Sequence, residues 1–327
     1  RLGTVGTILA GSGTGPLTIG IAGTAGSLTA GGTAANAAGE LIFINNSANK
    51  MTVNSAIVLN GTGVTTVVKS GTGTVALAGL NTYTGSLYLN GGILEYANGS
   101  ALGQNLGSQA AAATNILMNG GTLRQTATNN LIFGLTFNTI SAIDVPNTVT
   151  VTQTAQGMIG IAGVPGILQK TGLGTLTVSS TTDNLNLSVQ VQAGTFNMGK
   201  ASTATVHSVS GGAAAAALII EDLATAAITG TGGDQILDTS SVVVRSGGTF
   251  NLGTQSEAID GLAGGGSVIG TGGTLTLGGT AALTNNQANI SAYTLAAAGA
   301  LVTNTGLNNF SGVISGCLLY TSDAADE

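Results

Sequence analysis

The sequence predicts an all-β protein and, within that class, a parallel β-helix (β-solenoid) whose short strands stack coil upon coil. Three observations predict it. The composition is rich in glycine and poor in aromatic residues, apolar residues alternate with polar ones over short runs, and a motif recurs along the chain at a spacing typical of a coil. Each favours short, regularly spaced strands over helices.

The composition favours strands and corners over helices. Of 327 residues 54 are glycine, more than twice the usual share of this residue. Hydrophobic residues make up 43%, but aromatic residues only 3%, and tryptophan is absent. We therefore expect a core of Val, Ile, Leu and Ala. Three prolines and the high apolar content exclude collagen-like, proline-rich and disordered chains.

Short runs of the sequence alternate with a period of two, which is the signature of a strand. Leu176 and Val178 fall on one face while Thr175 and Thr177 fall on the other, and the segment 195–198 repeats the pattern. Gly-Gly, Asn-Gly and Gly-Thr-Gly steps separate the runs, and glycine takes positive φ at sharp corners without a steric clash. The chain is predicted to alternate strand and corner.

An internal repeat sets the coil length. The segment Lys69–Leu77 recurs as Lys170–Val178 and more weakly as Ile269–Leu277. The spacing inside the copies is almost constant, because the step from Val75 to Leu94 nearly equals the step from Leu176 to Phe196. A short strand cannot offset the entropy of ordering itself, but stacked coils about 4.8 Å apart share one core. We expect coils of about 20 to 25 residues, with asparagine ladders at stacked corners.

A β-sandwich or antiparallel barrel is the structural alternative, because it too needs many short strands. The regular spacing and the small core residues favour the β-helix. We expect residues 1–316 to form one continuous β-helix, with the best repeat at 69–103 and weaker copies at 169–199 and 269–316. The segment 317–327 resembles a translated sequencing adapter and is set aside as non-native; a natural C-terminal stretch is the alternative. We expect a fragment cut at both ends.

The best repeat resembles a known family. Lys-Ser-Gly-Thr-Gly-Thr at 69–74, Asn-Thr-Tyr-Thr-Gly at 81–85, Asn-Gly-Gly at 90–92 and Leu-Gly at 102–103 are similar to the passenger-associated transport repeat of bacterial autotransporters. The second copy keeps Lys170, Gly172 and Gly174 but has Thr-Asp-Asn-Leu-Asn at 182–186. In the third copy an Asn-Asn-Phe-Ser-Gly corner follows only at 308–312.

The resemblance implies a passenger segment that crosses the outer membrane through a C-terminal β-barrel translocator and folds outside as a right-handed, single-stranded parallel β-helix. It implies a structural stalk or adhesin-like protein at the cell surface or secreted from a Gram-negative bacterium. Candidate partners are host or matrix glycans or a second copy of the chain. Of Tyr83, Tyr88 and Tyr96, we expect Tyr96 to lie in the core.

Charge and cysteine content exclude several classes of partner. Only seven Lys and Arg residues are present and they are scattered, whereas binding to nucleic acid needs clustered bases. The longest apolar stretch, 211–220, is far shorter than the roughly 18 residues of a membrane helix, so we expect no direct membrane insertion. The single cysteine lies in the tail, which leaves no disulfide framework and no thiolate metal site.

Catalytic residues are few, and we predict no enzyme, no cofactor and no catalytic or metal site. We expect the single histidine, His207, at the surface or at an edge, and we expect three carboxylate pairs to be solvated loop charges: Glu221 with Asp222, Asp234 with Asp238, and Glu257 with Asp260. The segment 230–238 is weakly similar to a calcium-binding nonapeptide.

A polysaccharide-active β-helix enzyme, a lyase or hydrolase, is the main functional alternative. Its substrate groove would run along the same kind of stack, and it would need clustered acids beside a base. The spacing of Arg124 and Asp144 predicts that they lie on adjacent coils. Another surface or phage β-solenoid binding module is the third possibility.

Overall fold

A computed structural model describes residues 1–23, 26–103, 116–154, 156–164, 166–211, 216–271 and 274–277, with the strand backbones at 294–295 and 301–304. The chain divides into two compact units, Arg1–Met158 and Ile159–Glu327. Within the described ranges the one helical element is a 3-10 turn, η1 (Gly99–Leu102). No helix among these residues has the length and apolar character needed to span a bilayer.

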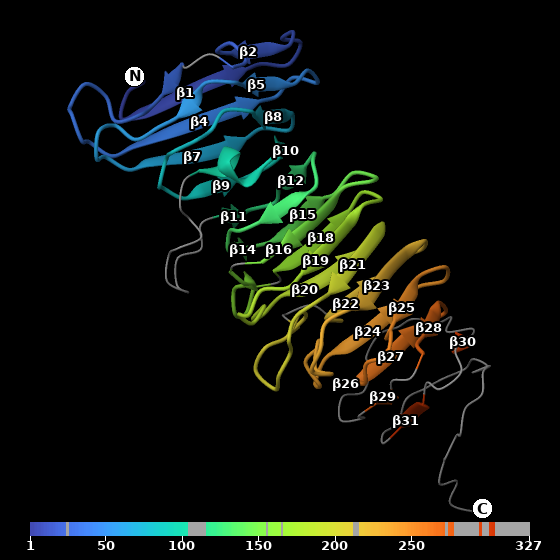
Figure 1. Cartoon of the computed structure of the whole chain (residues 1–327). Coiled ribbons are helices and arrows are strands. Elements are labelled where there is room, and N and C mark those ends of the chain that lie inside the picture. Colours follow the sequence, from blue (N-terminus) through green and yellow to red (C-terminus); the bar gives the residue numbers. More distant parts are fainter. Residues whose placement is uncertain are drawn as a thin grey trace, which may run out of the picture. The chain divides into compact units, whose positions relative to one another are not determined.

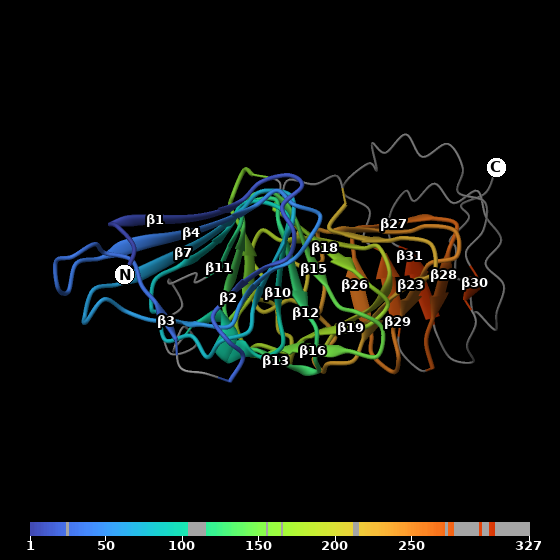
Figure 2. The ribbon, with the colours of Figure 1, turned by 90° about the horizontal axis from the view of Figure 1, so that it is seen from above.

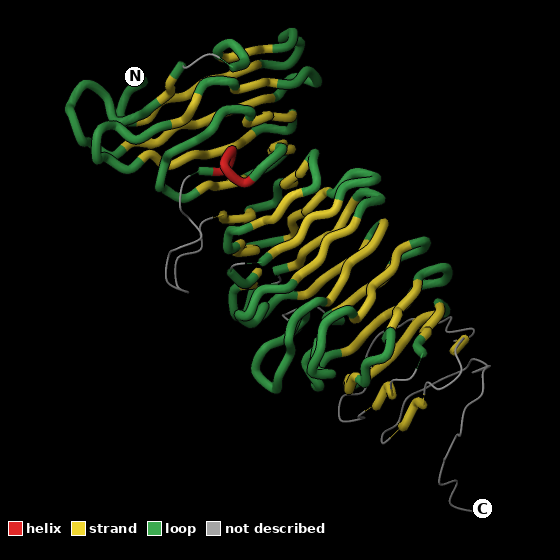
Figure 3. The backbone as a smooth tube through the Cα atoms, in the orientation of Figure 1, coloured by secondary structure: helices red, strands yellow, loops and turns green. Residues whose placement is uncertain are grey.

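Unit 1 is built from parallel strands that pair with the next coil rather than with their sequence neighbours (Figures 1 and 3). The first sheet contains, in spatial order, β1 (Val5–Ala10), β4 (Gly39–Asn45), β7 (Thr65–Ser70), β9 (Leu87–Leu89), β11 (Ile116–Met118) and β14 (Leu135–Phe137). The second contains β2 (Leu17–Ile19), β5 (Met51–Val53), β8 (Thr74–Leu77), β10 (Ile93–Tyr96), β12 (Thr122–Gln125) and β15 (Ile140–Asp144). Two further pairs are β13 (Asn129–Leu131) with β16 (Thr150–Gln153), and β3 (Ser27–Leu28) with β6 (Ala56–Ile57). The strand β17 (Met158–Gly160) lies where the two units divide.

Unit 2 repeats this construction. Its first sheet contains β18 (Ile167–Thr171), β20 (Ser188–Val191), β22 (Leu218–Ile220), β24 (Ser241–Val244) and β27 (Gly261–Gly264). The second contains β19 (Thr175–Val178), β21 (Gly194–Met198), β23 (Ala224–Ile228), β25 (Thr249–Asn251), β28 (Ser267–Ile269) and β30 (Thr294–Leu295). The third contains β26 (Glu257–Ile259), β29 (Thr274–Leu277) and β31 (Leu301–Asn304).

The stacking of parallel strands in register confirms the predicted parallel β-helix. In unit 1, for example, β1 pairs with β4 and β4 with β7, residue for residue and in parallel, and Figure 2 shows these long strands side by side. Connections between parallel strands are right-handed in about 98% of cases, so the right-handed winding that the resemblance implies is the one expected for such a stack.

The core consists of columns of apolar side chains, one from each coil. In the second sheet of unit 1 the column contains Met51, Val75, Leu94, Leu123 and Ile143, which are in register and buried. A second column, in the second sheet of unit 2, contains Leu176, Phe196, Ala226, Phe250 and Val268, also in register and buried. Each side chain therefore covers its neighbours above and below, which a single coil could not do.

The register within the repeat copies is the predicted one, but the uniform coil length is not. Val75 pairs with Leu94, and Leu176 pairs with Phe196. Elsewhere the step from one coil to the next is shorter, as from Thr249 to Ser267, or much longer, as from Val5 to Glu40. The expected coil length is therefore wrong for these coils, because the loops between strands absorb the difference while the strands stay in register.

The two copies of the repeat in unit 2 form corners between different pairs of sheets. The copy at 170–178 turns from β18 in the first sheet to β19 in the second, whereas the copy at 269–277 turns from β28 in the second sheet to β29 in the third. The motif is thus a strand-corner-strand unit that fits more than one corner. The remainder of the third copy, with the corner at 308–312, and the tail at 317–327 lie outside the described residues. One continuous β-helix over residues 1–316 stays a prediction.

Removing a buried side chain from the column in unit 2 should destabilise the fold. Phe196→Ala removes a ring that is fully buried between Leu176 and Ala226, so we expect the free energy of unfolding to fall by about 3–5 kcal/mol. Its sequence neighbour Thr195 lies on the outer face, and Thr195→Ala serves as the control with an expected change within about 0.5 kcal/mol. Denaturant unfolding followed by circular dichroism measures both; equal losses would contradict the column.

Candidate functional site

The first lysine of the repeat is buried and holds a corner together through hydrogen bonds to backbone carbonyls, an arrangement that we call a clamp. Lys69 is fully buried at the end of β7, and its ammonium group donates to the carbonyl oxygens of Ser70 at 2.9 Å, Gly71 at 2.9 Å and Gly91 at 2.8 Å. A lysine has three N–H donors and no acceptor, so three carbonyls satisfy it completely. The clamp closes its own corner and joins it to the following coil.

Unit 2 contains the same arrangement once, at Lys170, and a related one at Lys200, whose acceptors lie on the preceding coil. The ammonium of Lys170 donates to the Thr171, Gly172 and Ala193 carbonyls at 2.7–3.0 Å. That of Lys200 donates to the carbonyl and hydroxyl oxygens of Ser180 and to the Thr182 carbonyl. Burial lowers the pKa of Lys69 to about 8, and burial lowers the pKa of Lys200 to about 8 against the opposing charge of Asp183.

Glycine is required where these clamps meet the next coil. Gly92 has φ of +62°, and a side-chain carbon there would lie 2.7 Å from the Lys69 ammonium nitrogen. Gly194 has φ of +66°, and such a carbon would lie 2.6 Å from the Gly172 carbonyl oxygen. The glycines of the motif therefore give the neighbouring corner room to approach, in a backbone conformation that other residues rarely adopt.

The Asn-Thr-Tyr-Thr-Gly corner of the best repeat contacts the C-terminal end of that repeat. The side chain of Asn81 accepts a hydrogen bond from the Ile57 amide at 2.7 Å and donates to the Ala101 carbonyl. Tyr83 is fully buried, and its ring lies against Gly103. Asn184 takes the role of Asn81 in unit 2 by donating to the Ser208 carbonyl at 2.8 Å, although the surrounding motif is lost there.

The histidine is buried, contrary to the expectation of a surface or edge position. His207 is 3% exposed. Its Nδ1 lies 3.2 Å from Asp183 Oδ1 and its Nε2 lies 3.4 Å from Asp234 Oδ1. Since both ring nitrogens face carboxylates, a protonated ring can donate to both acids, whereas a neutral ring donates to one. Among the residues that the structure describes, the ring nitrogens face these two carboxylates and not a hydroxyl group, which a nucleophilic triad would need.

Of the acids expected to be solvated, Asp222 and Asp238 are exposed but others are buried or paired. Glu257 and Asp260 are nearly inaccessible, and Glu257 accepts the backbone N–H groups of Gln235 at 2.9 Å and Ile236 at 3.3 Å. Glu221 forms an ion pair with Arg245 at 2.7 Å, whereas Asp222 is exposed as expected. Alternation places polar groups at corners, but it does not reveal that the next coil covers them.

Burial governs the protonation of Glu257. Desolvation raises the pKa of its carboxyl group to about 8, and the charges of Asp234 and Asp238 add to this effect while the two backbone donors oppose it. Burial also raises the pKa of Asp234, against the favourable charge of His207. No group of three or more His, Cys, Asp or Glu side chains suited to a metal ion occurs in the part of the chain that the structure describes.

The predicted neighbours Arg124 and Asp144 do lie on adjacent coils. They are in register and form an ion pair at 2.5 Å. Glu95 on the coil before lies 3.9 Å from Arg124 and 2.7 Å from Lys50, so acids and bases alternate in a ladder across the coils. A catalytic groove would need carboxylates that are available to substrate, but the carboxylates of Glu95 and Asp144 form ion pairs with basic side chains.

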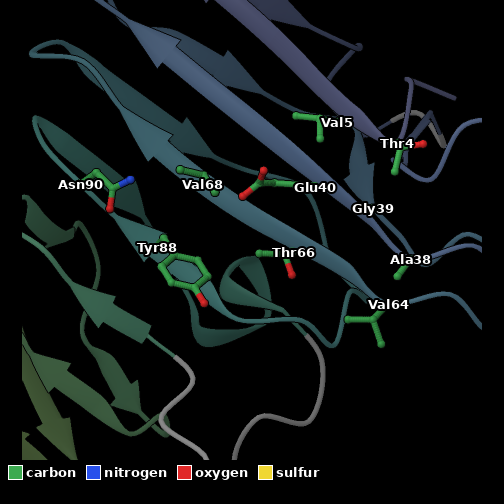
Figure 4. A pocket seen from close by; sticks show the side chains of 10 residues that line it. All are labelled: Thr4, Val5, Ala38, Gly39, Glu40, Val64, Thr66, Val68, Tyr88 and Asn90. Carbon is green, nitrogen blue, oxygen red and sulfur yellow. The ribbon is translucent and has the colours of Figure 1, made fainter.

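The outer face of the first sheet of unit 1 carries a hollow of about 540 Å³ (Figure 4). We call it the outer-face hollow and define it by side chains from β1, β4, β7 and β9 and from the residue after β9: Val5, Glu40, Thr66, Val68, Tyr88 and Asn90. The strands place them in rows, because Glu40 is in register with Val5 and Thr66, and Val68 is in register with Tyr88. Sequence reasoning missed this hollow because its residues come from four coils.

Comparison with known proteins reveals a distant, partial similarity to an adhesin. A segment of 135 residues, 41% of the chain, is 30% identical to the adhesin BmaC autotransporter of Brucella suis biovar 1 (strain 1330), and the match spans 4% of that protein's length. No family model matches the chain, and no solved structure matches it.

The clamp gives a first prediction for this region. Lys69→Met leaves the carbonyls of Ser70, Gly71 and Gly91 buried without their donor, and we expect the free energy of unfolding to fall by about 2 kcal/mol or more. Lys50→Met is the matched control, because Lys50 is half exposed and makes a surface ion pair worth at most about 1 kcal/mol. Denaturant unfolding of both variants tests this; a larger loss in Lys50→Met would contradict it.

The buried carboxyl gives a second prediction. The pKa of Glu257 rises from 4.5 to about 8 on folding, so the folded chain binds more protons between these values. The contribution of Glu257 to stability is therefore complete below pH 4.5 and is lost as pH rises to about 8. Glu257→Gln should reduce the fall in denaturation midpoint between about pH 5 and about pH 8, whereas Asp222→Asn should leave it unchanged. An unaltered pH profile in Glu257→Gln would contradict the assignment.

Proposed function

We propose that this chain is a β-helical passenger segment of an exported surface protein of a Gram-negative bacterium and acts as a structural stalk or in adhesion. The observation that carries the proposal is the in-register parallel stack, together with the partial similarity to an adhesin autotransporter. On this proposal a C-terminal β-barrel translocator belongs to the same protein, and the segment reaches the cell surface or is secreted.

The local nature of the contacts supports export in an unfolded form. The lysines of the two repeat copies each join a corner to the following coil, since Lys69 reaches Gly91 and Lys170 reaches Ala193, and Lys200 reaches back to the preceding coil. A coil that has just emerged therefore finds its partners on its immediate neighbour. Residues 1–316 contain no cysteine, so disulfides within them would not hinder the passage of an extended chain.

A role without catalysis is part of the proposal. The ion pairs of Arg124 with Asp144 and Glu95 occupy the acids that a polysaccharide-active enzyme would use. His207 is likewise held between Asp183 and Asp234. We propose that the outer faces serve mechanical support and binding, with glycans or a second copy of the chain as partners, and that nucleic acid and the membrane interior are not partners.

Surface display tests the export proposal. The chain is placed between an export signal and an autotransporter translocator in a Gram-negative host, and intact cells are treated with protease. We expect the chain at the surface, as a protease-resistant core. Leu176→Asp puts a charge into the buried column and should abolish the resistant core. The proposal would be contradicted if the wild-type chain and Leu176→Asp were equally sensitive to protease, or if the wild-type chain did not reach the surface.

The same purified chain tests the enzyme alternative. Incubated with polygalacturonate and calcium, it should release no unsaturated or reducing ends above a heat-denatured control. Arg124→Met serves as the diagnostic variant, because an enzyme using Arg124 and Asp144 would lose its activity with this change. Turnover by the wild-type chain that Arg124→Met abolishes would replace the structural role with the enzymatic one.

A further inference from the structure

We propose that the outer-face hollow of unit 1 binds an uncharged saccharide. The inference deepens the proposed function and rests on it, because it supplies a ligand class for an adhesion surface. The hollow's volume of about 540 Å³ falls within the range of small-ligand sites, which combine apolar walls with a few polar groups that fix orientation. The groups around it divide into an acceptor, a donor and an apolar platform.

The acceptor is the carboxylate of Glu40. It comes from β4 between Val5 and Thr66, and within the described ranges it has neither a hydrogen bond nor an ion pair. The acids of the neighbouring sheet differ, since Glu95 and Asp144 are both tied to Arg124. In Figure 4 the carboxylate of Glu40 points along the hollow toward Val68. A hydroxyl group that donates to such a carboxylate forms a charge-assisted hydrogen bond.

The donor is the side-chain amide of Asn90. An amide ladder runs across three coils: Asn138 donates to Asn119 at 2.6 Å, and Asn119 donates to Asn90 at 2.8 Å. The amide oxygens of Asn119 and Asn90 are thus occupied, and the ladder ends at the amide nitrogen of Asn90. Asn90 is exposed, and in Figure 4 its nitrogen lies on the side that faces Val68. The ladder therefore presents a donor at the hollow.

The platform is the ring of Tyr88, which is partly exposed beside the buried side chain of Val68. Val5, 58% exposed, forms an apolar rim. The weakly polar C–H face of a sugar ring packs against an aromatic face, and a tyrosine hydroxyl remains available for hydrogen bonding at the edge. Figure 4 places Glu40, Thr66 and Asn90 around Tyr88 and Val68.

This combination selects an uncharged saccharide. Sugar hydroxyls both donate and accept, so one ring can use the Glu40 carboxylate and the Asn90 amide together. An acidic saccharide would bring a second negative charge to Glu40, where none of the described lining residues is basic, and this repulsion disfavours it. A basic peptide would form an ion pair with Glu40, but its side chains would offer no acceptor to the Asn90 amide. A lysine oligopeptide is therefore included among the probes.

The experiment measures binding of the full chain to defined probes. Labelled chain is titrated with lactose and maltotriose as neutral sugars, sialyllactose and trigalacturonate as acidic sugars, and a lysine oligopeptide. We expect at least one neutral sugar to bind and the acidic sugars and the peptide not to bind. Tyr88→Ala and Glu40→Gln should each weaken neutral-sugar binding about tenfold or more, as the loss of one good contact predicts. Tyr88→Phe keeps the ring and should lose less.

Matched controls separate the site from the fold. Leu117→Ala removes the half-buried side chain next to Tyr88 in the same row, and Asp222→Asn removes an exposed charge in unit 2; neither should alter sugar affinity. Unfolding midpoints confirm that all variants are folded. The inference is overturned if no neutral sugar binds, if acidic sugars or the peptide bind instead, or if Tyr88→Ala and Glu40→Gln leave affinity unchanged. A chain that is displayed at the surface but binds no sugar overturns this inference alone.

Discussion

Satisfying the backbone carbonyls at each corner is the constraint on which this structure depends. A coil turns sharply around a narrow apolar core, so carbonyl groups converge where no strand can pair with them, and buried unpaired carbonyls are costly. Lys69, Lys170 and Lys200 meet this need with ammonium groups. Asn45 and Gln125 meet it with amides, which donate to the carbonyls of Asn49 and Thr74 and of Ala127 and Asn129.

The choice between an ammonium and an amide trades charge against hydrogen bonds. An ammonium gives three donors but must be desolvated, and the lowered pKa of Lys69 and Lys200 reflects that cost. An amide gives two donors without a charge. Once an ammonium has three acceptors its removal is worse than its presence, because the acceptors stay buried. The low share of charged residues, 6%, therefore understates the part that charge plays inside the stack.

The repeating elements of the fold could be predicted from the sequence, but the burial of individual side chains by neighbouring coils could not. Alternation and spacing predicted the register of Val75 with Leu94, the burial of Tyr96, the asparagine ladders and the adjacency of Arg124 and Asp144. They did not predict the burial of His207 or Glu257, because the groups that contact these side chains lie on neighbouring coils and the coil length varies. The outer-face hollow was missed for the same reason.

The variable coil step has a consequence for how such proteins diversify. The short step from Thr249 to Ser267 and the long one from Val5 to Glu40 produce the same parallel pairing, so the length of chain between two strands is decoupled from the pairing itself. Segments inserted between strands change what the chain presents outward while leaving the buried columns intact. Selection for new surface chemistry can therefore act on the connecting loops nearly independently of selection for folding.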